Sequence, residues 1–358
     1  MVDTVTLKVG GQVIDAWTSL RIERSIDTVC SRFQLSLANP VGAEVDLSAI
    51  SDQAPCQIYL GGDLVMTGFI DHVSDKVGQS LMISGRDKTM DLVDCSAVHK
   101  PGWWRGQTLQ AIVKDLVAPF GIALRVECDT GGVFANFALE HGETAFEAIS
   151  RLCQMRGVMV RSDADGALVV FKPTGKRAAI TFELGRNLEE FSIDIDSAGR
   201  CSTYTLKGQH HGGDFVSPKD AAQPSATSAD PGVSRYRPLI IISQDQATLA
   251  GLKSRALWEA TVRKGRALKV GVAVKGWRDD AGVLFRPDTT AGLVAAARGL
   301  DLDMTIASLS FTLEDKGSRT ALTLSRPEAF TTEALLEPKV KKHKKHGGPN
   351  FAAEFGDN

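Results

Sequence analysis

The amino-acid sequence predicts a β-rich α+β protein. Alternating apolar and polar residues, interrupted by tight turns, fill the first hundred positions and return after about Ala178. Between about Lys100 and Pro173 the apolar residues instead recur at helical spacing. Hydrophobic residues make up 43% and charged residues 23% of the 358 positions, which is typical of a soluble globular chain long enough for two or three packed units.

The N-terminal part begins with a hairpin. Thr4 to Val9 alternates, Gly10-Gly11 supplies the turn, and Val13 and Ile14 resume the apolar run. In the following strand, Leu20, Ile22 and Ile26 share one face, but Arg24 interrupts it. Short strands with regular turns indicate a barrel or a sandwich. The strands expected after the hairpin are Leu20 to Ile26, Arg32 to Leu37, Cys56 to Leu60, Leu64 to His72 and Ser80 to Gly85.

The central part predicts two helices, each followed by a strand. Leu109 to Phe120 has helical apolar spacing, and Gly121 is placed to end the helix before a strand at Ile122 to Val126. Thr144 to Glu147 is a capping-box sequence that opens a second helix ending at Gly157. Strands at Val158 to Arg161 and Leu168 to Phe171, joined by a turn at Asp163 to Gly166, complete a small α+β module.

The C-terminal part predicts strands again, with one long interruption. Asp214 to Pro238 is rich in Pro, Ser, Ala, Asp and Gly and is expected to be a mobile loop. Ser243 to Gln246 is a second capping box, opening a helix that continues through Leu249 to Val262. The expected strands are Glu190 to Ile195, Ser202 to Gln209, Leu268 to Val274, Asp301 to Leu313 and Thr320 to Leu324.

Charge is distributed unevenly along the chain. The total is 41 basic against 43 acidic residues, yet five lysines gather after Pro338 (Lys339, Lys341, Lys342, Lys344 and Lys345). The body is therefore acidic, which argues against a surface built throughout to bind phosphate backbones. The basic end is expected to be disordered, and could bind DNA, RNA or an acidic protein surface, or only be solvated.

The pattern of cysteines and the lack of a recognisable targeting signal favour a reducing compartment. The six cysteines are spread singly, with no C-x-x-C pair, and are expected to be small core residues. The N-terminus has neither a basic n-region nor an apolar h-region, and no stretch approaches the length of a spanning helix. Synthesis and folding in a cytoplasm, without stable membrane insertion, is the expectation.

Catalytic and metal-binding signatures are weak. Asp163-x-Asp165-Gly166 resembles the start of a calcium loop, but its Gly is misplaced, so a hairpin turn is the better interpretation. His210-His211 lacks a third ligand at convincing spacing. The paired acids Glu189-Glu190 and Asp279-Asp280 are interpreted as solvated turn or edge residues. Because nucleophile-elbow, Walker and dinucleotide motifs are also absent, no catalytic residue, metal site or cofactor is predicted.

Trp103-Trp104 is the most unusual dipeptide. Two adjacent indoles cannot both face one core on regular structure, so one of them could be a contact residue. Aromatic anchors are enriched at interface centres, but a tryptophan stapling a domain junction explains the pair equally well. With the five tail lysines, Trp103 and Trp104 are the candidate interface residues.

The order of these parts resembles the baseplate hub proteins of contractile-tailed phages, most closely the Mu-like hub family, and more distantly the hub half of type VI secretion spike proteins. Three stretches carry the resemblance: Val5 to Gly11 with Trp17 to Ile26 and Phe33 to Leu37; the paired segments Gly106 to Ile122 and Glu143 to Val158; and the closing strands from Met304 to Pro327.

The resemblance implies a ring-forming homotrimer with two tube-type, β-barrel-like domains in each subunit. The first would span residues 1–98, an α+β module 99–175, and the second tube domain 176–330 with an inserted loop and helix at about 213–264, followed by a basic tail at 331–358. Three such chains would match both a trimeric spike and a sixfold tail tube. No residue-by-residue repeat links the two strand-rich segments.

The leading hypothesis is therefore a non-enzymatic structural hub in the tail baseplate of the virion. It would join the trimeric spike to the tail tube, contact other baseplate proteins, help to initiate tube assembly, and meet DNA only in transit. Two alternatives stay open: a tail-associated cell-wall hydrolase, and a nucleic-acid-binding protein that acts through Lys339 to His346.

Overall fold

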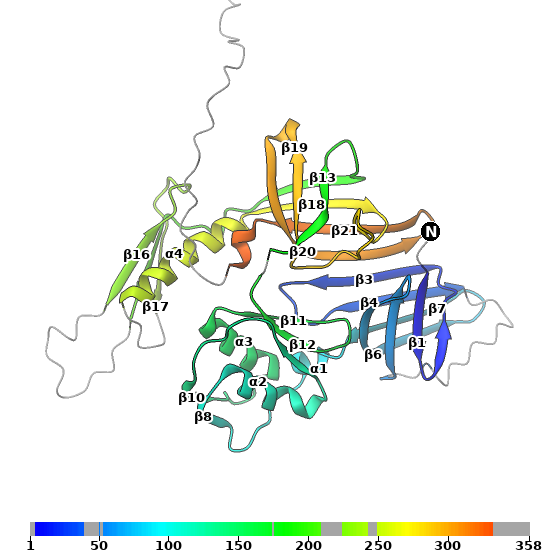
Figure 1. Cartoon of the computed structure of the whole chain (residues 1–358), viewed down its shortest axis with the longest axis horizontal. Helices are drawn as coiled ribbons and strands as arrows, with labels where there is room; N and C mark the ends of the chain where they lie inside the picture. Colours follow the sequence, from blue (N-terminus) through cyan, green and yellow to red (C-terminus); the bar gives the residue numbers. More distant parts are fainter. Residues whose placement is uncertain are drawn as a thin grey trace, which may run out of the picture.

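A computed structural model describes residues 4–38, 50, 53–173, 175–208, 224–242 and 249–331. The protein is β-rich with few helices, as predicted. Figure 1 shows two strand-rich blocks side by side, an α+β module against them, and a small sheet carrying one long helix at the far end from the N-terminus. No helix in these ranges is long and apolar enough to cross a lipid bilayer.

The first strand block is an antiparallel arrangement that starts at the N-terminus. Residues alternate between buried and more exposed positions along most of its strands, and in β7 buried and partly exposed residues alternate throughout, because one face packs on the core. Its strands are β1 (Val5–Val9), β2 (Gln12–Ile14), β3 (Ser19–Ser25), β4 (Arg32–Ala38), β5 (Pro55–Leu60), β6 (Asp63–Lys76) and β7 (Ser80–Asp87).

The α+β module follows directly and has a core of its own. Thr144 caps the second long helix with both bonds of the predicted capping box, and Gly157 ends it with φ of 58°. The module consists of α1 (Met90–Asp94), β8 (Trp103–Gln107), α2 (Leu109–Val117), the 3-10 turn η1 (Ala118–Phe120), β9 (Leu124–Val126), β10 (Phe134–Ala138), α3 (Ala145–Arg156), β11 (Met159–Ser162) and β12 (Leu168–Phe171).

The second strand block is assembled from two stretches of chain on either side of an insertion. It contains β13 (Arg177–Glu183), β14 (Glu190–Ile195), β18 (Leu268–Lys275), β19 (Thr290–Ala295), η2 (Ala296–Arg298), β20 (Leu300–Glu314), β21 (Gly317–Ser325) and η3 (Pro327–Phe330). The inserted unit contains β15 (Thr203–Lys207), β16 (Ser225–Ala229), β17 (Pro238–Ile242) and α4 (Leu249–Arg266).

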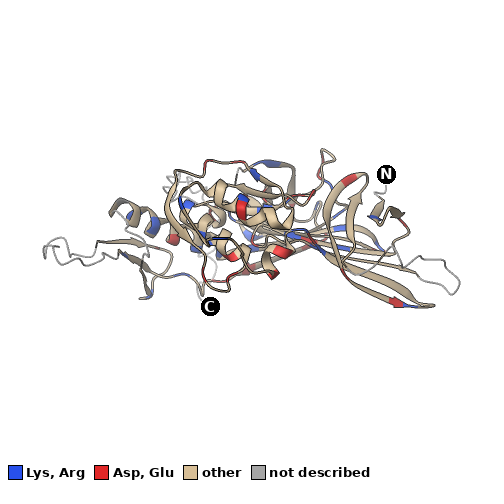
Figure 2. Ribbon diagram, turned by 90° about the horizontal axis from the view of Figure 1, so that it is seen from below, with Lys and Arg blue, Asp and Glu red and all other residues tan. Residues whose placement is uncertain are grey.

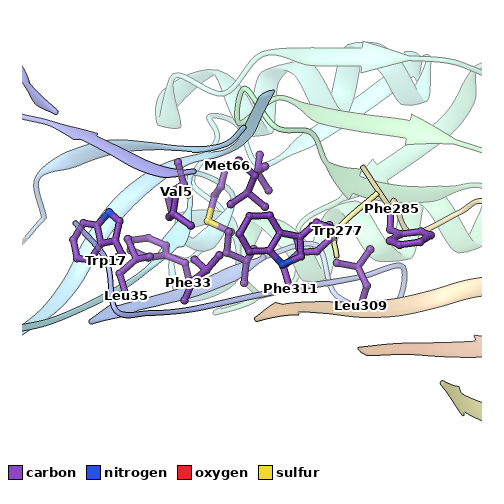
Figure 3. Packing of buried hydrophobic residues seen from close by; sticks show 14 of the residues in the cluster. Val5, Trp17, Phe33, Leu35, Met66, Trp277, Phe285, Leu309 and Phe311 are labelled. Atoms are coloured by element: carbon purple, nitrogen blue, oxygen red, sulfur yellow. The ribbon is translucent and has the colours of Figure 1, made fainter. Parts of the chain in front are cut away.

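The two strand blocks share one 13-stranded sheet. Antiparallel pairing of β3 with β20, from Ser25 opposite Ser308 to Leu20 opposite Leu313, joins them edge to edge. One hydrophobic cluster runs beneath both blocks, and Figure 3 shows it continuing from Trp17, Leu35 and Phe33 of the first block to Trp277 and Phe311 of the second. The blocks therefore cannot separate without breaking both a hydrogen-bond ladder and a common core.

The strand connectivity of the first block is repeated in the second. The spatial order β1-β5-β6-β7-β4-β3 corresponds to β13-β19-β20-β21-β18-β14, and the corresponding strands follow each other in the same order along the chain. Both long strands carry a β-bulge in their pairing with the next strand of the chain. In β6, which pairs with β7, it lies between Ile70 and His72, and in β20, which pairs with β21, it lies between Ile306 and Ser308. One pairing differs, because β1 is antiparallel to β5 whereas β13 is parallel to β19.

Several sequence predictions need correction. Part of the stretch expected to be a loop, Asp214 to Pro238, forms β16, which pairs with β15. The 224–229 segment contains small polar residues, and this pairing with a neighbouring strand outweighs its weak intrinsic strand preference. Strands β8, β10, β13, β17 and β19 and the short helix α1 were not predicted. The second capping box, Ser243 to Gln246, lies outside the described residues.

The cysteines are free, and Cys30, Cys56, Cys128 and Cys153 belong to a hydrophobic core cluster or pack against one, whereas Cys95 and Cys201 do not. Only Cys56 and Cys153 are buried, and burial raises the pKa of each thiol to about 12. Cys30, Cys128 and Cys201 are partly exposed and Cys95 is exposed. Single cysteines carry no periodicity of their own, so the sequence does not separate core positions from surface positions.

Candidate assembly surfaces

Small residues occupy the middle of the sheet face that points away from the core. Ser192, Gly271, Thr323, Ser308 and Ser25 stand opposite one another in register across five adjacent strands. Together with the residues around them they line a groove of about 1030 Å³, whose wall on the module side includes Val93 and Phe146. Because no bulky side chain rises from this floor, another chain or a bound polymer could approach the backbone closely.

The charged side chains on that face are mostly paired with one another. Arg21 lies 2.7 Å from Glu23, Arg86 lies 2.8 Å from Asp94, and Arg319 lies 2.7 Å from Glu190. Such partly exposed pairs contribute little to stability. They do neutralise cations that would otherwise attract phosphate groups.

A buried carboxylate joins the first strand block to the module. Asp87, 1% exposed at the end of β7, accepts hydrogen bonds from the backbone N–H of Ser31 at 2.7 Å, from that of Thr89 at 2.9 Å, and from Ser162 Oγ at 2.7 Å. A buried carboxylate is tolerated only when donors satisfy its oxygens, and here the donors come from three segments of chain. Asp87 therefore fixes how the module sits on the sheet.

Three arginines from distant segments meet beside this carboxylate. Arg24 of β3, Arg161 of β11 and Arg286 line a small cavity of about 20 Å³ together with Ser31 and Ser162. The pKa of Arg24 is lowered to about 10, chiefly by burial and then by the neighbouring Arg286, while Asp87 and Asp163 act in the opposite direction. Arg24 is still charged at neutral pH and places a cation at the junction of the three parts.

Asp288 is the second buried carboxylate of this junction. It is 9% exposed, and burial raises its pKa to about 6, against the opposing effect of Arg161. The separation of Arg161 Nη1 from Asp288 Oδ2 is 4.0 Å, so the pair lacks a hydrogen bond and the carboxylate is poorly compensated. Asp288 also adopts a positive φ of 69°, which asparagine would tolerate equally.

The two candidate tryptophans have different environments on β8. Trp104 is 5% exposed, stacks on His99 at 4.3 Å between ring centroids, and donates its indole N–H to Asp115 at 2.9 Å. Trp103 points the other way, is 45% exposed, and lies under the guanidinium of Arg105 at 4.7 Å. Only Trp104 faces the core, as expected for two successive residues of a strand, and Trp103 is the exposed indole.

Several strand edges are open among the described residues, and those of β14 and of part of β6 lie in the shared sheet. The outer edge of β14 has no strand partner, and it exposes Ile195 at 70% and Ile193 at 36%. The stretch His72 to Lys76 of β6 pairs with β7 on one side only. Exposed edges with apolar side chains are typical pairing sites for another strand.

The residues set aside as non-catalytic have structural partners. Asp163 and Asp165 both pair with Arg125 at a hairpin turn, and Asp279 accepts backbone bonds from Ala281 and Val283. Glu189 and Glu190 both pair with Arg319. No cluster of three metal-ligating side chains occurs within the described ranges. His210, His211 and the five tail lysines lie outside the described residues.

Sequence reasoning missed the arginine cluster and Asp87, although one signal was visible. Arg24 stands at a core-facing position of an otherwise alternating strand, and such a break in the pattern marks a side chain with a specific environment. Its partners, Arg161 and Arg286, come from segments far apart in the chain, which only the tertiary structure brings together.

Models of tail and baseplate protein families match four consecutive or overlapping segments. They are described as Mu phage baseplate assembly protein GpP-like, N-terminal (residues 4–87); baseplate hub protein gp44-like, second domain (89–172); tail protein NMB1110-like, third domain (200–257); and Mu phage baseplate assembly protein GpP, fourth domain (248–333).

Individual relatives agree with these matches. The baseplate hub protein gp44 of Escherichia phage Mu is 32% identical over 354 residues, covering 96% of this chain and 93% of gp44. The 43 kDa tail protein of prophage MuSo2 from Shewanella oneidensis has a TM-score of 0.81 at 31% identity, covering 92% of this chain and 99% of that one. The E. coli type VI secretion component c3393 has a TM-score of 0.58 at 12% identity, covering 93% and 80%, and so shares the fold.

Proposed function

This chain belongs to the baseplate hub protein family of phage Mu, and from that membership we propose that it forms a trimeric ring joining the spike to the tail tube. The hub would sit in the tail baseplate of the virion after synthesis in the host cytoplasm. It would contact the trimeric spike, the tube protein and other baseplate proteins, and help to initiate tube assembly.

The observation that carries this proposal is the repeated connectivity of the two strand blocks. Three copies of a chain with two topologically equivalent blocks present six similar units around one axis, which suits a threefold partner on one side and a sixfold partner on the other. The similarity is one of strand order and pairing, which sequence comparison within the chain does not reveal.

The repeat also suggests how one copy would meet the next. Within the chain, β3 of the first block pairs with β20 of the second. The equivalent of β3 is β14, the equivalent of β20 is β6, and both β14 and β6 have an open edge. A heterologous contact between β14 of one copy and β6 of the next would therefore repeat the internal junction and close a ring.

The register of this contact follows from the bulges. His72 of β6 and Ser308 of β20 follow equivalent bulges, so they are aligned. This alignment places Ile195 of one copy opposite Val73 of the next, and the equivalent pair within the chain is Arg24 opposite Leu309. Two positions further, Ile193 would stand opposite Asp75. The exposed Ile195 and Val77, at 70% and 73%, would both be covered, which supports this edge as the junction.

The small-residue face of the sheet would then line the channel. Serine, threonine and glycine leave it smooth, and the pairing of Arg21, Arg86 and Arg319 with carboxylates reduces the number of cations that could hold DNA phosphates. DNA would meet this surface in transit without being retained.

A direct test is oligomeric state combined with a directed cross-link. The trimer of this 38.4 kDa chain would have a mass of 115.2 kDa by light scattering. In a Cys95→Ser background, Ile195→Cys with Val73→Cys should form a disulfide between copies under oxidation, because opposed strand residues have Cβ atoms about 5 Å apart. Val13→Cys with Val73→Cys is the control, since Val13 is exposed on β2, away from the proposed contact.

A chain that stays monomeric at high concentration and binds neither spike nor tube protein would refute the hub proposal. A trimer in which the Ile195–Val73 cross-link does not form would refute this particular contact. The relatives named above are structural tail and baseplate proteins, in keeping with a non-enzymatic role. Peptidoglycan cleavage that depends on one carboxylate would instead favour the cell-wall hydrolase.

A further inference from the structure

A second groove lies between the α+β module and the inserted helix, outside the proposed ring contacts. It has a volume of about 840 Å³. One wall comes from α3 and β11, and the other from α4 and η3. Peptide and ligand sites are commonly hollows of this size with mostly apolar walls and a few placed charges.

The polypeptide leaves the described part of the structure inside this groove. Thr331, which lines it, is the last residue described. The indole N–H of Trp258 on α4 donates a hydrogen bond to the Thr331 carbonyl, and Thr331 Oγ1 donates to the Glu328 carbonyl at 3.0 Å. The start of the following segment is therefore held at the groove by two bonds.

The walls combine apolar surface with positive charge. Met155 is 47% exposed, and Phe146, Met159 and Trp258 add partly exposed apolar surface. Arg156, Arg255 and Arg266 bring three cations, against the single lining carboxylate of Asp27. The excess positive charge continues along α4, where five Lys and Arg residues accompany one Glu, as the blue segments of the left-hand helix in Figure 2 illustrate.

The three arginines differ in how far they are already engaged. Arg156 donates a bond to the Gly132 carbonyl, and its guanidinium lies 4.0 Å from the centroid of the Phe134 ring. Arg266 is exposed and makes only a long bond, 3.4 Å, to the Ala329 carbonyl. Arg255 by contrast already pairs with Glu259 at 3.0 Å.

The sequence that follows Thr331 has complementary chemistry. Residues 332–338 read Thr-Glu-Ala-Leu-Leu-Glu-Pro, with two leucines between two glutamates. We propose that this groove binds the chain's own segment 332–338, with Leu335 and Leu336 against the apolar wall and Glu333 and Glu337 near Arg156 and Arg266. Seven residues span at most about 25 Å, and the tether at Thr331 gives the segment a high effective concentration.

With this segment bound, the lysine run would begin beyond the groove. Lys339 to Lys345 would be repelled by the cationic walls, so binding of the acidic segment would direct the basic end outward from a fixed point on the module and α4. The inference does not depend on trimer formation, and it concerns a surface that the proposed strand-edge contact leaves free.

Photo-cross-linking in the full-length chain tests the proposal. A benzophenone amino acid at Leu335 should insert into the groove, chiefly at Met155 or Met159, and tryptic mapping identifies the site. Mixing chains of normal and heavy isotopic mass before assembly shows whether each cross-link lies within one chain. The same probe at Phe351, beyond the lysine run, should not mark the groove.

Charge reversal supplies the specificity control. Arg266→Glu should lower the yield of the groove cross-link at least threefold, and adding Glu337→Lys should restore it. Arg298→Glu, which changes an exposed arginine of η2 outside the groove, should leave the yield unchanged. Unchanged thermal melting of each variant establishes that the fold is intact.

Three results would overturn the inference. The probe at Leu335 could mark no groove residue, it could mark the groove only between chains of different isotopic mass, or Arg266→Glu could leave the yield unchanged. The second result would assign the groove to a second copy. Failure of the trimer test leaves the cross-linking experiment valid, because an intrachain contact is measured equally well in a monomer.

Discussion

The hydroxyl of Ser162 donates a 2.7 Å hydrogen bond to the carboxylate of Asp87, across 75 residues of chain. Ser162 ends β11 of the module, and Asp87 ends β7 of the first strand block. The same Asp87 oxygen also accepts the Ser31 N–H, so two partners from different segments converge on one atom. This contact is the polar link that sets the module against the sheet.

Asp87→Ala should lower the free energy of unfolding by about 3 kcal/mol, because it leaves several buried donors without an acceptor. Chemical denaturation at neutral pH measures the change. Asp27→Asn, at an exposed carboxylate, is the control and should change stability by less than about 0.5 kcal/mol. Equal stability of the Asp87 variant and the parent would show that water replaces the carboxylate at no cost.

Asp288 should make stability depend on pH. Its pKa in the folded protein, about 6, lies above the value of about 3.9 expected in the unfolded chain. The folded state therefore holds the proton more tightly, and this contribution is present below about pH 4, is lost as the pH rises to about 6, and stays lost above that.

Asp288→Asn removes that titration while keeping the side-chain shape and the tolerance of positive φ. At pH 7 the variant should be more stable than the parent by about 2 kcal/mol, and the difference should vanish near pH 4. Denaturation midpoints measured from pH 4 to 7 check this. A difference that does not change with pH would contradict the raised pKa.

The two tryptophans should separate stability from assembly. Trp104→Ala should destabilise the module by about 3–5 kcal/mol, since it empties a buried site and removes the bond to Asp115. Trp103→Ala should leave melting unchanged and, if the exposed indole is an interface anchor, weaken assembly by about 2 kcal/mol or more. Melting curves and co-purification with baseplate partners distinguish them, and unaltered assembly would reduce Trp103 to a surface residue.

Gly265→Ala should loosen the packing of α4 against η3. A Cβ at position 265 would lie 2.5 Å from the backbone nitrogen of Ala329, closer than any real contact allows, so η3 must shift. A cost of about 2 kcal/mol is expected, with faster amide exchange over residues 327–331. Gly199→Ala is the matched control, because a Cβ there meets no atom. Equal exchange in both variants would contradict the predicted displacement of η3.

The sequence predicted the elements whose signals are local. Caps at Thr144 and Gly157, and alternation in β1, β4 and β7, need only neighbouring residues, and these elements appear where expected. Strands such as β16 and β19 exist because a partner strand lies beside them, which no local pattern reports. The sequence does not reveal the likeness of the two strand blocks for a similar reason, because that likeness lies in the strand-pairing order and the positions of the β-bulges.

The candidate surfaces were predictable only in part. The Trp103-Trp104 dipeptide predicted that one indole would be exposed, because a strand with one face on the core buries only one of two successive side chains. The open edges of β14 and β6 depend on which strands pair elsewhere in the sheet, so they become visible only with the topology.

The ladder between β3 and β20 gives the junction of the two strand blocks a directional resistance to force. A pull along the strands loads every hydrogen bond from Ser25 to Leu20 together, so the junction yields only when all of them fail at once. A pull across the strands, away from the shared edge, would open the same bonds one after another from an end. Force parallel to the strands would therefore leave the two strand blocks joined, whereas a smaller force across the strands would separate them at the β3–β20 junction.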